Sequence, residues 1–404
     1  MKILYFHQHF QIPTQAGGTR SYEMAQRLIS KGHEVCMVCG EMAKLDLPPT
    51  TSSGVYRGFV NGIEVIQIAL PYSNKDSLFT RTLTFVKFAY KGIRIAMKER
   101  YDLLFATSTP LTAGIPGIFA KWFRKKKFVF EVRDLWPELP KALGLKNPIL
   151  LWGMGFLEWL TYRSADACVG LSPGICDGIA KRSPKKKKII MLPNSCDLDI
   201  FTPDNKTELA LDGIKAGDRV AVFTGAHGAA NGLDAILDAA KVLLNRNRHD
   251  IIFAFIGDGK VKDHLKERVA KENITNCRFY DPIPKVQLSK ILASADVGLM
   301  VLANSPAFYY GTSPNKFFDY ISSGLPVLNN YPGWLADMIR DNNLGIVVPP
   351  NNPETFAEGL IKLIDNQELS KNIRINARLF AEQNFSRDKI ANDLASFLES
   401  ILCI

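Results

Sequence analysis

Lys316 and Asp319 stand three residues apart in the segment TSPNKFFDYISSGLPV, which covers residues 312–327. This segment predicts a loop, a short helix that begins at Ser313, a glycine turn and a strand. Residues three apart share one face of a helix, so the ammonium and the carboxylate could meet the phosphates and the ribose hydroxyls of a nucleoside diphosphate. The helix N-terminus adds free N–H groups that suit an anion. The alternative is an ion pair on a solvated helix face.

Three glycine-rich loops follow expected strands, and each could bring backbone amides close to a phosphate or a sugar. Gly17 and Gly18 precede the first helix, Gly225 and Gly228 follow a strand near the middle of the chain, and Gly257 follows the next strand. None of these loops has the G-x-G-x-x-G spacing of dinucleotide binders, so NAD is not favoured. Their repetition in both halves of the chain favours a phosphate-bearing ligand.

Charged residues also gather where the expected strand Phe128–Val132 ends. Glu131 lies in that strand, Arg133 and Asp134 follow it directly, and Glu138 comes four residues later. Buried strand ends rarely carry such residues unless they are paired or functional. The group therefore indicates either a binding site or an ion-paired structural corner.

Asp197 and Asp199 match the D-x-D pattern that holds a metal in some nucleotide-sugar enzymes. They lie at the expected junction between two domains, where aspartates commonly cap turns. We therefore expect neither a metal nor a cofactor.

The elements that position these residues alternate strand and helix along the whole chain. Such alternation predicts an α/β fold in which doubly wound parallel sheets are covered by helices on both faces, with ligands at the carboxyl ends of the strands. A length of 404 residues favours two domains. We expect the first over residues 1–195 and the second over 196–385, with a helix at 386–404 that packs back on the first. The strands expected in the first half are Ile3–Phe6, Glu34–Cys39, Ile63–Ala69, Leu103–Ala106, Phe128–Val132, Ala167–Gly170 and Ile189–Leu192.

The chain carries a formal net charge of +10. Between Leu78 and Arg100 basic residues alternate with apolar ones at nearly helical spacing, which is typical of a helix on an anionic membrane surface. A solvated face on a packed helix is the alternative. The sequence has no zinc-finger, RNA-binding or repeat signature, so nucleic acid is not expected. No signal-peptide pattern and no membrane-spanning stretch occur, and we expect a cytoplasmic protein that associates peripherally with the inner face of the membrane.

These segments, in this order, resemble the retaining family 4 glycosyltransferases of the GT-B fold, in which two Rossmann-like domains face each other across a cleft. Within that family the chain looks most like the WbuB type, the L-fucosamine transferases of bacterial surface polysaccharides. Two departures stand out. Where many members have the first glutamate of an E-x7-E motif this chain has Gly311, with Asp319 in the second place. Where many have an arginine and a lysine in the second-domain glycine loop, it has Ala226, His227 and Asn231.

The resemblance implies transfer of a sugar from a UDP-sugar to a polyprenyl-diphosphate-linked saccharide, with retention and without metal. It implies Lys316 as the main stabiliser of the leaving diphosphate, and Arg133, Asp134 and Glu138 as residues that position the acceptor or the sugar. The positions that it places at the donor are Gly17, Gly18, Arg20, Gly225, His227, Gly228, Gly257, Ile283, Ser313, Pro314, Asn315, Lys316 and Asp319.

Two other functions fit the same residues. One is a UDP-sugar 2-epimerase of the same fold, which would act without an acceptor. The other is a non-catalytic sugar-binding assembly protein, for which the absent first glutamate gives a reason.

Overall fold

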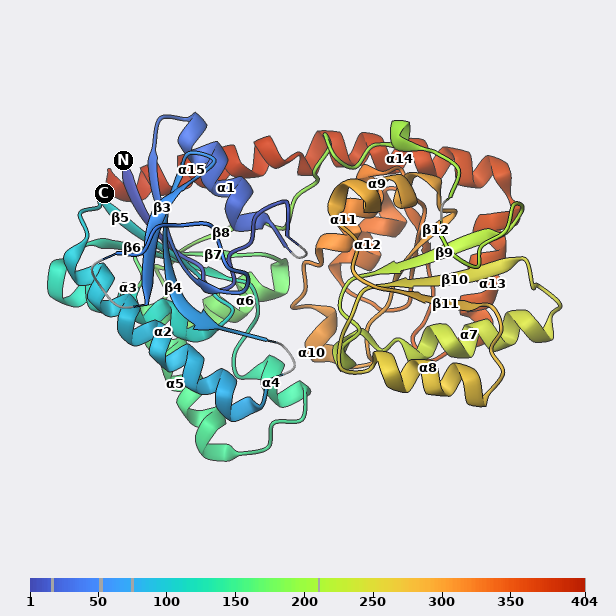
Figure 1. Ribbon diagram of the computed structural model, residues 1–404, viewed down its shortest axis with the longest axis horizontal. Coiled ribbons are helices and arrows are strands. Elements are labelled where there is room, and N and C mark those ends of the chain that lie inside the picture. The colour runs from blue at the N-terminus through green and yellow to red at the C-terminus, as the bar shows by residue number, and fades with distance from the viewer. Residues whose placement is uncertain (16–17, 51–53, 74–75, 210, 404) are drawn as a thin grey trace. The chain divides into compact units, whose positions relative to one another are not determined.

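The chain forms two α/β units, which a computed structural model describes over residues 1–15, 18–50, 54–73, 76–209 and 211–403. Unit 1 comprises Met1–Pro193, Gly311–Ser313 and Asp388–Ile404, and unit 2 comprises Asn194–Tyr310 and Pro314–Arg387. Each unit is built around one sheet whose strands are covered on both faces, as the alternation of strand and helix predicts (Figure 1).

Unit 1 holds an eight-stranded sheet in the order β3-β4-β2-β1-β5-β6-β7-β8. Its central strands are apolar at nearly every position, because helices cover both faces and all side chains after the first residue of each strand are buried. The strands are β1 (Lys2–Phe6), β2 (Glu34–Glu41), β3 (Val55–Val60), β4 (Ile63–Pro71), β5 (Leu103–Thr107), β6 (Lys127–Val132), β7 (Ala167–Gly170) and β8 (Lys188–Met191).

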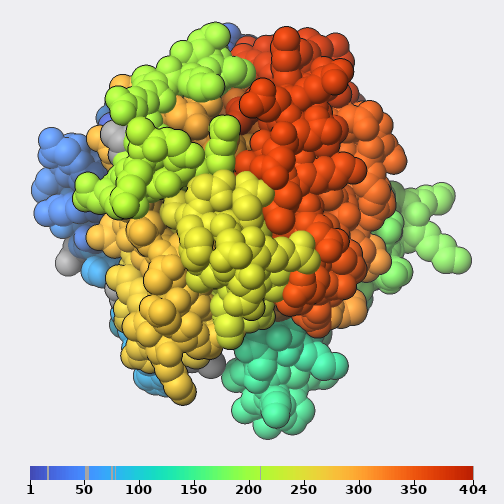
Figure 2. Space-filling view, turned by 90° about the vertical axis from the view of Figure 1, so that its right-hand side faces the viewer, coloured from blue at the N-terminus to red at the C-terminus, as the bar shows by residue number. Residues whose placement is uncertain are grey.

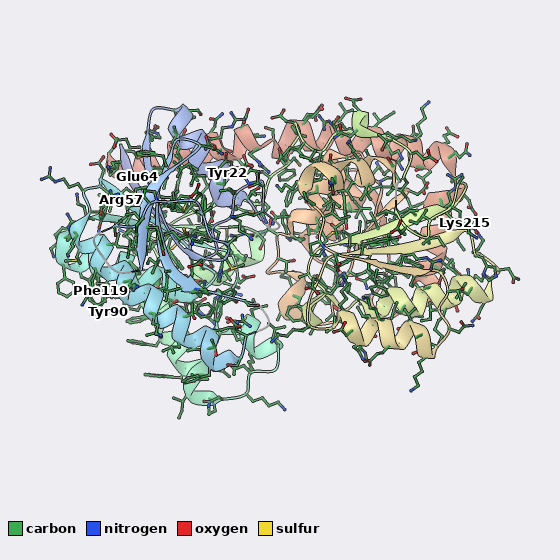
Figure 3. All side chains as sticks on the ribbon, in the orientation of Figure 1. Tyr22, Arg57, Glu64, Tyr90, Phe119 and Lys215 are labelled. Carbon is green, nitrogen blue, oxygen red and sulfur yellow. The ribbon has the colours of Figure 1, made fainter. Side chains whose placement is uncertain are left out.

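One strand of this sheet, β3, is absent from the expected strands. It pairs antiparallel with β4 at the sheet edge, while the other neighbours in the sheet are parallel. The turn is Asn61-Gly62, with φ of +48° and +84°, a pair that favours tight hairpins and is the sequence signal for this one. Arg57 Nε donates to Glu64 Oε1 at 2.8 Å across the hairpin, and both side chains are labelled in Figure 3.

Alternate residues of the strands in unit 1 build two cores, one on each face of the sheet. On one face, Tyr5 and Phe105 pack with residues of α1 and α15, and on the other, Phe6 and Phe130 pack with residues of α2, α3, α5 and α6. Figure 1 shows α1 and α15 on one side of this sheet and α2, α3 and α5 on the other. The helices are α1 (Arg20–Ser30), α2 (Leu78–Lys98), η1 (Leu111–Gly114), α3 (Ile115–Arg124), α4 (Glu138–Ala142), α5 (Pro148–Ser164), α6 (Pro173–Arg182) and α15 (Arg387–Leu402), which lies in unit 1 from Asp388 onward.

Unit 2 holds a six-stranded parallel sheet in the order β11-β10-β9-β12-β13-β14. The strands are β9 (Arg219–Thr224), β10 (Ile251–Ile256), β11 (Cys277–Tyr280), β12 (Val297–Met300), β13 (Val327–Asn329) and β14 (Gly345–Val347). The helices are η2 (Pro203–Asn205), η3 (Ala229–Asn231), α7 (Asp234–Asn245), α8 (Lys262–Lys271), α9 (Lys285–Ser294), α10 (Pro306–Tyr309), α11 (Asn315–Ser322), α12 (Trp334–Asp341), α13 (Pro353–Asp365) and α14 (Gln367–Phe385).

The helices of unit 2 also divide between the two faces of its sheet. Residues of α7 and α13 pack with Phe223 and Phe253 on one face, and residues of α9, α11, α12 and α14 pack with Val222 and Ile256 on the other. Figure 2 shows the outer surface of this unit, where the yellow surface of α7 borders the red surface that α13 and α14 form. Helix α11 carries the residues of the candidate site, and it lies at the carboxyl end of the sheet.

Candidate active site

The sheet of unit 2 has its topological switch point between β9 and β12. The chain runs from β9 to β10 and β11 on one side and returns to β12 on the other. In open α/β sheets, ligands bind outside the carboxyl ends of the strands at such a point. Lys316 lies there: its Nζ is 3.5 Å from the centre of the Phe223 ring, and a β-carbon added to Gly225 would lie 3.6 Å from Nζ.

Tyr320 fixes the helix that carries Lys316. Its hydroxyl accepts a hydrogen bond from the backbone N–H of Thr224 at 3.0 Å, at the end of β9. Its ring lies against Gly298 in β12, where an added β-carbon would come within 2.6 Å of the ring. Gly324, with φ of +62°, then ends the helix in a left-handed turn. α11 is therefore held to both strands that form the switch point.

The helix begins at Asn315, not at Ser313 as the sequence predicts. The residue before a proline is disfavoured in the helical region, so Ser313 cannot continue a helix through Pro314. Pro314 itself is the N-cap, with an extended backbone, and Asn315 is exposed. Ser313 is buried, and the expected contacts of these three residues with a nucleotide stay predictions.

Lys316 is partly buried, and loss of hydration lowers the pKa of its ammonium group from 10.5 to about 7. Among the described residues, no carboxylate lies within ion-pair distance of its Nζ, which lies instead over the ring of Phe223. An ammonium that has lost water without gaining a carboxylate gains strongly from an incoming anion. Lys316 therefore has the electrostatics of a ligand-binding group.

Asp319 is also partly buried, and this burial raises the pKa of its carboxyl group from 3.8 to about 6, while the nearby charges of Lys285 and Arg387 lower it. The alternative of an ion pair between Asp319 and Lys316 is not found among the described residues. Neither side chain therefore neutralises the charge of the other. The expected contact of Asp319 with ribose stays a prediction.

The glycine loops after β9 and β10 are joined to one another. A β-carbon on Gly257 would lie 1.9 Å from the carbonyl oxygen of Gly225, so the two backbones meet only because Gly257 has no side chain. The N–H of Gly225 donates to Ile256 O at 2.9 Å, and that of His227 donates to Asp258 O at 2.9 Å. These two amides are engaged within the unit, and the expected contacts of Gly225 and Gly257 with a diphosphate stay predictions.

Gly228 keeps open space beside its α-carbon, since an added β-carbon would meet no atom within 4 Å. Ile283 follows β11 and packs partly buried against the core beneath the sheet. Both remain predicted donor positions.

The side chain of His227 lies inside the unit rather than at a ligand. Its ring centre is 6.1 Å from that of Phe223, 6.2 Å from that of Phe255 and 6.3 Å from that of Phe279. Burial lowers the pKa of this imidazole to about 4, so it is neutral near pH 7. His227 is therefore a packing residue by its side chain, which corrects its assignment to the donor.

The sheet of unit 1 has its switch point between β1 and β5, and polar residues from three adjacent strand ends gather there. Arg133 Nη1 lies 3.4 Å from His7 Nε2, and the Arg133 N–H donates to Ser108 Oγ at 2.8 Å. Thr109 Oγ1 donates to Asp134 Oδ2 at 3.3 Å, and burial raises the pKa of that carboxyl. Burial and the Arg133 charge hold the pKa of His7 well below its usual range. Arg133 and Asp134 thus lie at the edge of the sheet where ligands bind in open α/β folds, and their contact with an acceptor or a sugar stays a prediction.

Arg20, expected at the donor, is instead part of the interior of unit 1. Its Nε and Nη2 donate to Glu131 Oε1 at 3.1 and 2.8 Å, and Nη1 and Nη2 donate to the carbonyls of Pro193 and Leu192. Both charged side chains are buried. This pair is the structural corner that the sequence left open as an alternative, and Arg20 has little donor capacity left for a phosphate. Of the glycines before it, Gly18 is described and partly buried, while Gly17 lies outside the described residues.

Glu138 is similarly occupied by a neighbour. Its carboxylate pairs with Arg182, which also pairs with the buried Glu158. Glu158 accepts further hydrogen bonds from Tyr162 Oη at 2.7 Å and from the Trp136 N–H at 3.1 Å. Glu138 therefore belongs to a network that ties α4 to α5 and α6, and the structure does not leave it free to position an acceptor.

Asp197, one half of the D-x-D pattern, is buried and ion-paired, with Oδ2 at 3.1 Å from Arg387 Nη1 and 3.6 Å from Lys285 Nζ. Over the described ranges of the chain, no group of three His, Cys, Asp or Glu residues is placed to hold a metal ion. None of the helices in those ranges is both long and apolar enough to cross a membrane.

Two residues that hold the site together, Phe223 and Tyr320, are not among those the sequence points to. Both read as ordinary core aromatics, Phe223 in a buried strand and Tyr320 on the apolar face of a helix. Only the approach of α11 to the ends of β9 and β12 gives the ring and the hydroxyl their roles.

Comparison with known proteins agrees with this architecture. A family model described as "Glycosyl transferase 4-like domain" matches residues 16–195, and one described as "Glycosyl transferases group 1" matches residues 205–380. The probable glycosyltransferase WbjE of Pseudomonas aeruginosa is 25% identical over 325 residues, which are 78% of this chain and 79% of WbjE.

Two solved structures share the fold at low sequence identity. WaaG, a glycosyltransferase involved in lipopolysaccharide biosynthesis, has a TM-score of 0.68 at 17% identity, with 98% of this chain and 99% of WaaG covered. Anabaena HepE in complex with UDP-glucose has a TM-score of 0.71 at 15% identity, with 99% of this chain and 100% of HepE covered. With two α/β units and a glycosyltransferase family model over each, which together match residues 16–195 and 205–380, the chain belongs to the glycosyltransferases and has the GT-B fold.

Proposed function

We propose that this glycosyltransferase transfers a sugar from a UDP-sugar to a polyprenyl-diphosphate-linked saccharide, with retention, in bacterial surface polysaccharide synthesis such as that of O-antigen or capsule. N-acetyl-L-fucosamine or a related amino sugar is the first candidate for the transferred group. The observation that carries the proposal is Lys316, a partly buried lysine at the switch point of unit 2 that has no carboxylate partner among the residues that the structure describes. The UDP-glucose complex of HepE and the role of WaaG in lipopolysaccharide synthesis support the donor class and the pathway class.

In this reaction, unit 2 stabilises the departing diphosphate. As the bond between the anomeric carbon and the diphosphate oxygen breaks, negative charge grows on UDP, and a cation already in place lowers the barrier. Lys316 supplies that charge and Asp319 holds the ribose hydroxyls. The acceptor oxygen bonds to the anomeric carbon on the same face, and its proton passes to the leaving phosphate. No metal and no protein nucleophile take part in this scheme.

In unit 1, Arg133 and Asp134 position the acceptor or the transferred sugar. Arg133 offers donors toward an anionic or hydroxyl-rich group, while Asp134, held by Thr109, accepts from hydroxyls. The neutral imidazole of His7 beside Arg133 adds a further hydrogen-bonding atom, since its Nδ1 has no partner among the described residues.

The test incubates the purified protein with a panel of UDP-sugars, with and without a short-chain polyprenyl-diphosphate saccharide. We expect UDP release and acceptor elongation with one UDP-sugar only when both substrates are present, with the anomeric configuration kept in the product. Appearance of a C2 epimer without acceptor would instead establish a 2-epimerase. Tight UDP binding with neither reaction would establish a non-catalytic sugar-binding protein.

The lipid-linked acceptor places the reaction at the cytoplasmic leaflet of the membrane, and we propose peripheral, salt-sensitive contact there. The cations of α2, among them Lys87, Lys91 and Arg94, would each contribute roughly 1 kcal/mol near an anionic surface. Their replacement by glutamate should weaken binding to anionic vesicles at low salt, whereas no change would return α2 to the alternative of a solvated face.

A further inference from the structure

Three helices of unit 1 form one outer layer. Residues of α2, α3 and α5 pack on the same face of the sheet, through Phe88, Ile118 and Tyr162 among others. These elements approach closely: a β-carbon on Gly92 of α2 would lie 2.8 Å from Pro116 in α3, and one on Gly114, at the end of η1 and directly before α3, would lie 2.7 Å from Thr161 in α5. Because all three bury one side against the sheet, their opposite sides face outward together (Figure 1).

The outward side of this layer, the α2–α3–α5 face, is apolar where solvated helix faces are normally polar. Trp152 and Ile149 of α5 are 72% and 77% exposed, and Phe79 of α2 is 79% exposed. Figure 3 labels Tyr90 of α2 and Phe119 of α3 on this part of unit 1. The large exposed apolar residues of the face are Phe79, Leu83, Val86, Tyr90 and Met97 of α2, Trp122 and Phe123 of α3, and Ile149, Leu150, Trp152, Phe156 and Trp159 of α5.

On α5 these residues form one continuous stripe. Ile149, Trp152, Phe156 and Trp159 recur at intervals of three and four, so they lie on one side of the helix. The rings follow one another along it: Trp152 and Phe156 are stacked with centres 5.7 Å apart, and Phe156 and Trp159 are tilted with centres 5.8 Å apart. Arg163 ends the stripe, with its guanidinium carbon 5.7 Å from the centre of the Trp159 ring.

The stripe on α2 has the same design. Phe79, Leu83, Val86 and Tyr90 recur at intervals of four, three and four. Arg94 ends this run, 4.6 Å from the centre of the Tyr90 ring. Two helices of this layer thus each present an aromatic and aliphatic stripe that finishes in a cation held on an aromatic ring.

The charges of the α2–α3–α5 face have a single sign. Neither α2 nor α3 contains an aspartate or glutamate, although α2 carries five basic residues and α3 carries two. The one acidic residue of α5, Glu158, is buried and paired with Arg182. A docking protein would be expected to meet both signs of charge, whereas an anionic lipid surface needs only cations around an apolar centre.

We propose that the α2–α3–α5 face is a membrane-insertion surface, in which the aromatic stripe of α5 enters the interfacial region of an anionic bilayer while cations of α2 hold lipid headgroups. Tryptophan suits this depth, because its ring is apolar and its N–H remains at the wet boundary. The proposal rests on the proposed use of a lipid-linked acceptor, and it goes beyond charge attraction by α2. It makes α5 the principal anchor.

The experiment is co-sedimentation with vesicles of phosphatidylcholine alone and of phosphatidylcholine with phosphatidylglycerol, using the full chain. We expect binding to the anionic vesicles, and a loss of at least tenfold in the partition coefficient for the triple variant Trp152→Ser/Phe156→Ser/Trp159→Ser. A matched control removes three exposed apolar residues of unit 2, Val286→Ser/Ile375→Ser/Leu379→Ser, and should bind within about twofold of the parent protein. Unchanged binding of the α5 triple variant, or equal loss in the control, overturns the proposal.

Two further measurements separate the alternatives. Lipids brominated near the headgroup should quench tryptophan fluorescence of the parent protein and quench a Trp152→Phe/Trp159→Phe variant much less, which a purely electrostatic contact would not produce. Sedimentation velocity without lipid should give the same mass for the parent and for the α5 triple variant. If the parent protein is a dimer and the triple variant is a monomer, a second copy covers this face, and the membrane assignment is overturned. UDP affinity of the triple variant, measured by calorimetry, should match that of the parent, so a failed glycosyl transfer and a failed membrane contact are told apart.

Discussion

Replacing Lys316 by methionine separates the charge of this residue from its packing. In the parent protein, Nζ of Lys316 lies 3.5 Å from the centre of the Phe223 ring. Methionine has nearly the same length as lysine, so it can keep this contact and the approach to Gly225. We expect the variant to lose at least about a hundredfold in kcat/KM, since removing one preorganised stabiliser of transition-state charge costs on the order of 10²–10³. We also expect the folded variant to be more stable than the parent.

The gain in stability follows from the pKa of Lys316. A decrease from 10.5 to about 7 would correspond to about 5 kcal/mol for a fully desolvated ammonium, at about 1.4 kcal/mol for each tenfold change in proton affinity. Lys316 is only partly buried, and the Phe223 ring returns ~1 kcal/mol or more to the cation. We therefore expect ~1–3 kcal/mol in favour of methionine.

The lowered pKa of Lys316 also fixes the direction in which the stability of the folded protein changes with pH. Below about pH 7 the lysine is protonated in both the folded and the unfolded chain, and the whole cost of desolvation is present. Between about pH 7 and 10.5 the unfolded chain binds more protons than the folded one, so the parent gains stability as pH rises. The advantage of the methionine variant should therefore be largest at and below neutral pH and fade toward pH 10.

Hydrogen exchange followed by mass spectrometry can measure the difference in stability between the variant and the parent in peptides of β9 and α11. This measurement does not assume that the two units unfold together. Lys215→Met, which removes an exposed cation from the same unit (labelled in Figure 3), is the matched control and should change neither exchange nor kcat/KM. A Lys316→Met protein with near-normal turnover would remove this residue from the mechanism. Faster exchange in β9 and α11 would show instead that the charged lysine stabilises the fold, and would refute the electrostatic reasoning.

The remaining predictions concern protons, a buried ion pair and metal. The affinity for UDP, measured by calorimetry, should fall between pH 7 and 9 as Lys316 loses its proton, and the Lys316→Met variant should lack this decline. Glu131→Gln should destabilise unit 1 by about 3–5 kcal/mol in denaturant unfolding, because it leaves the Arg20 charge buried without its partner. The same variant should leave UDP affinity unchanged. A nearly neutral effect on unfolding would contradict the assignment of this pair as structural. Transfer activity should survive exhaustive EDTA treatment, since Asp197 is already paired with two cations, and recovery of lost activity by Mg²⁺ or Mn²⁺ would contradict this.

The sequence by itself determined the architecture and the places where ligands are expected. Runs such as Leu103–Ala106 are apolar at successive positions, which only a strand covered on both faces requires, and their alternation with amphipathic helices predicts two parallel sheets. The same local rules located the glycine turns and put Lys316 and Asp319 on one helix. These features depend on neighbours in the chain, so local patterns are enough to find them.

Tertiary structure alone decided which polar residues remain available. Arg20 and Glu131, 111 positions apart, neutralise each other in the interior, and Arg182 occupies Glu138 from 44 positions away. His227 points into an aromatic cluster, although its loop has the composition of a phosphate site. Whether a charged or polar side chain serves a ligand or the fold depends on the groups that surround it in three dimensions, because a buried charge must find a partner and takes whichever the packing brings within reach.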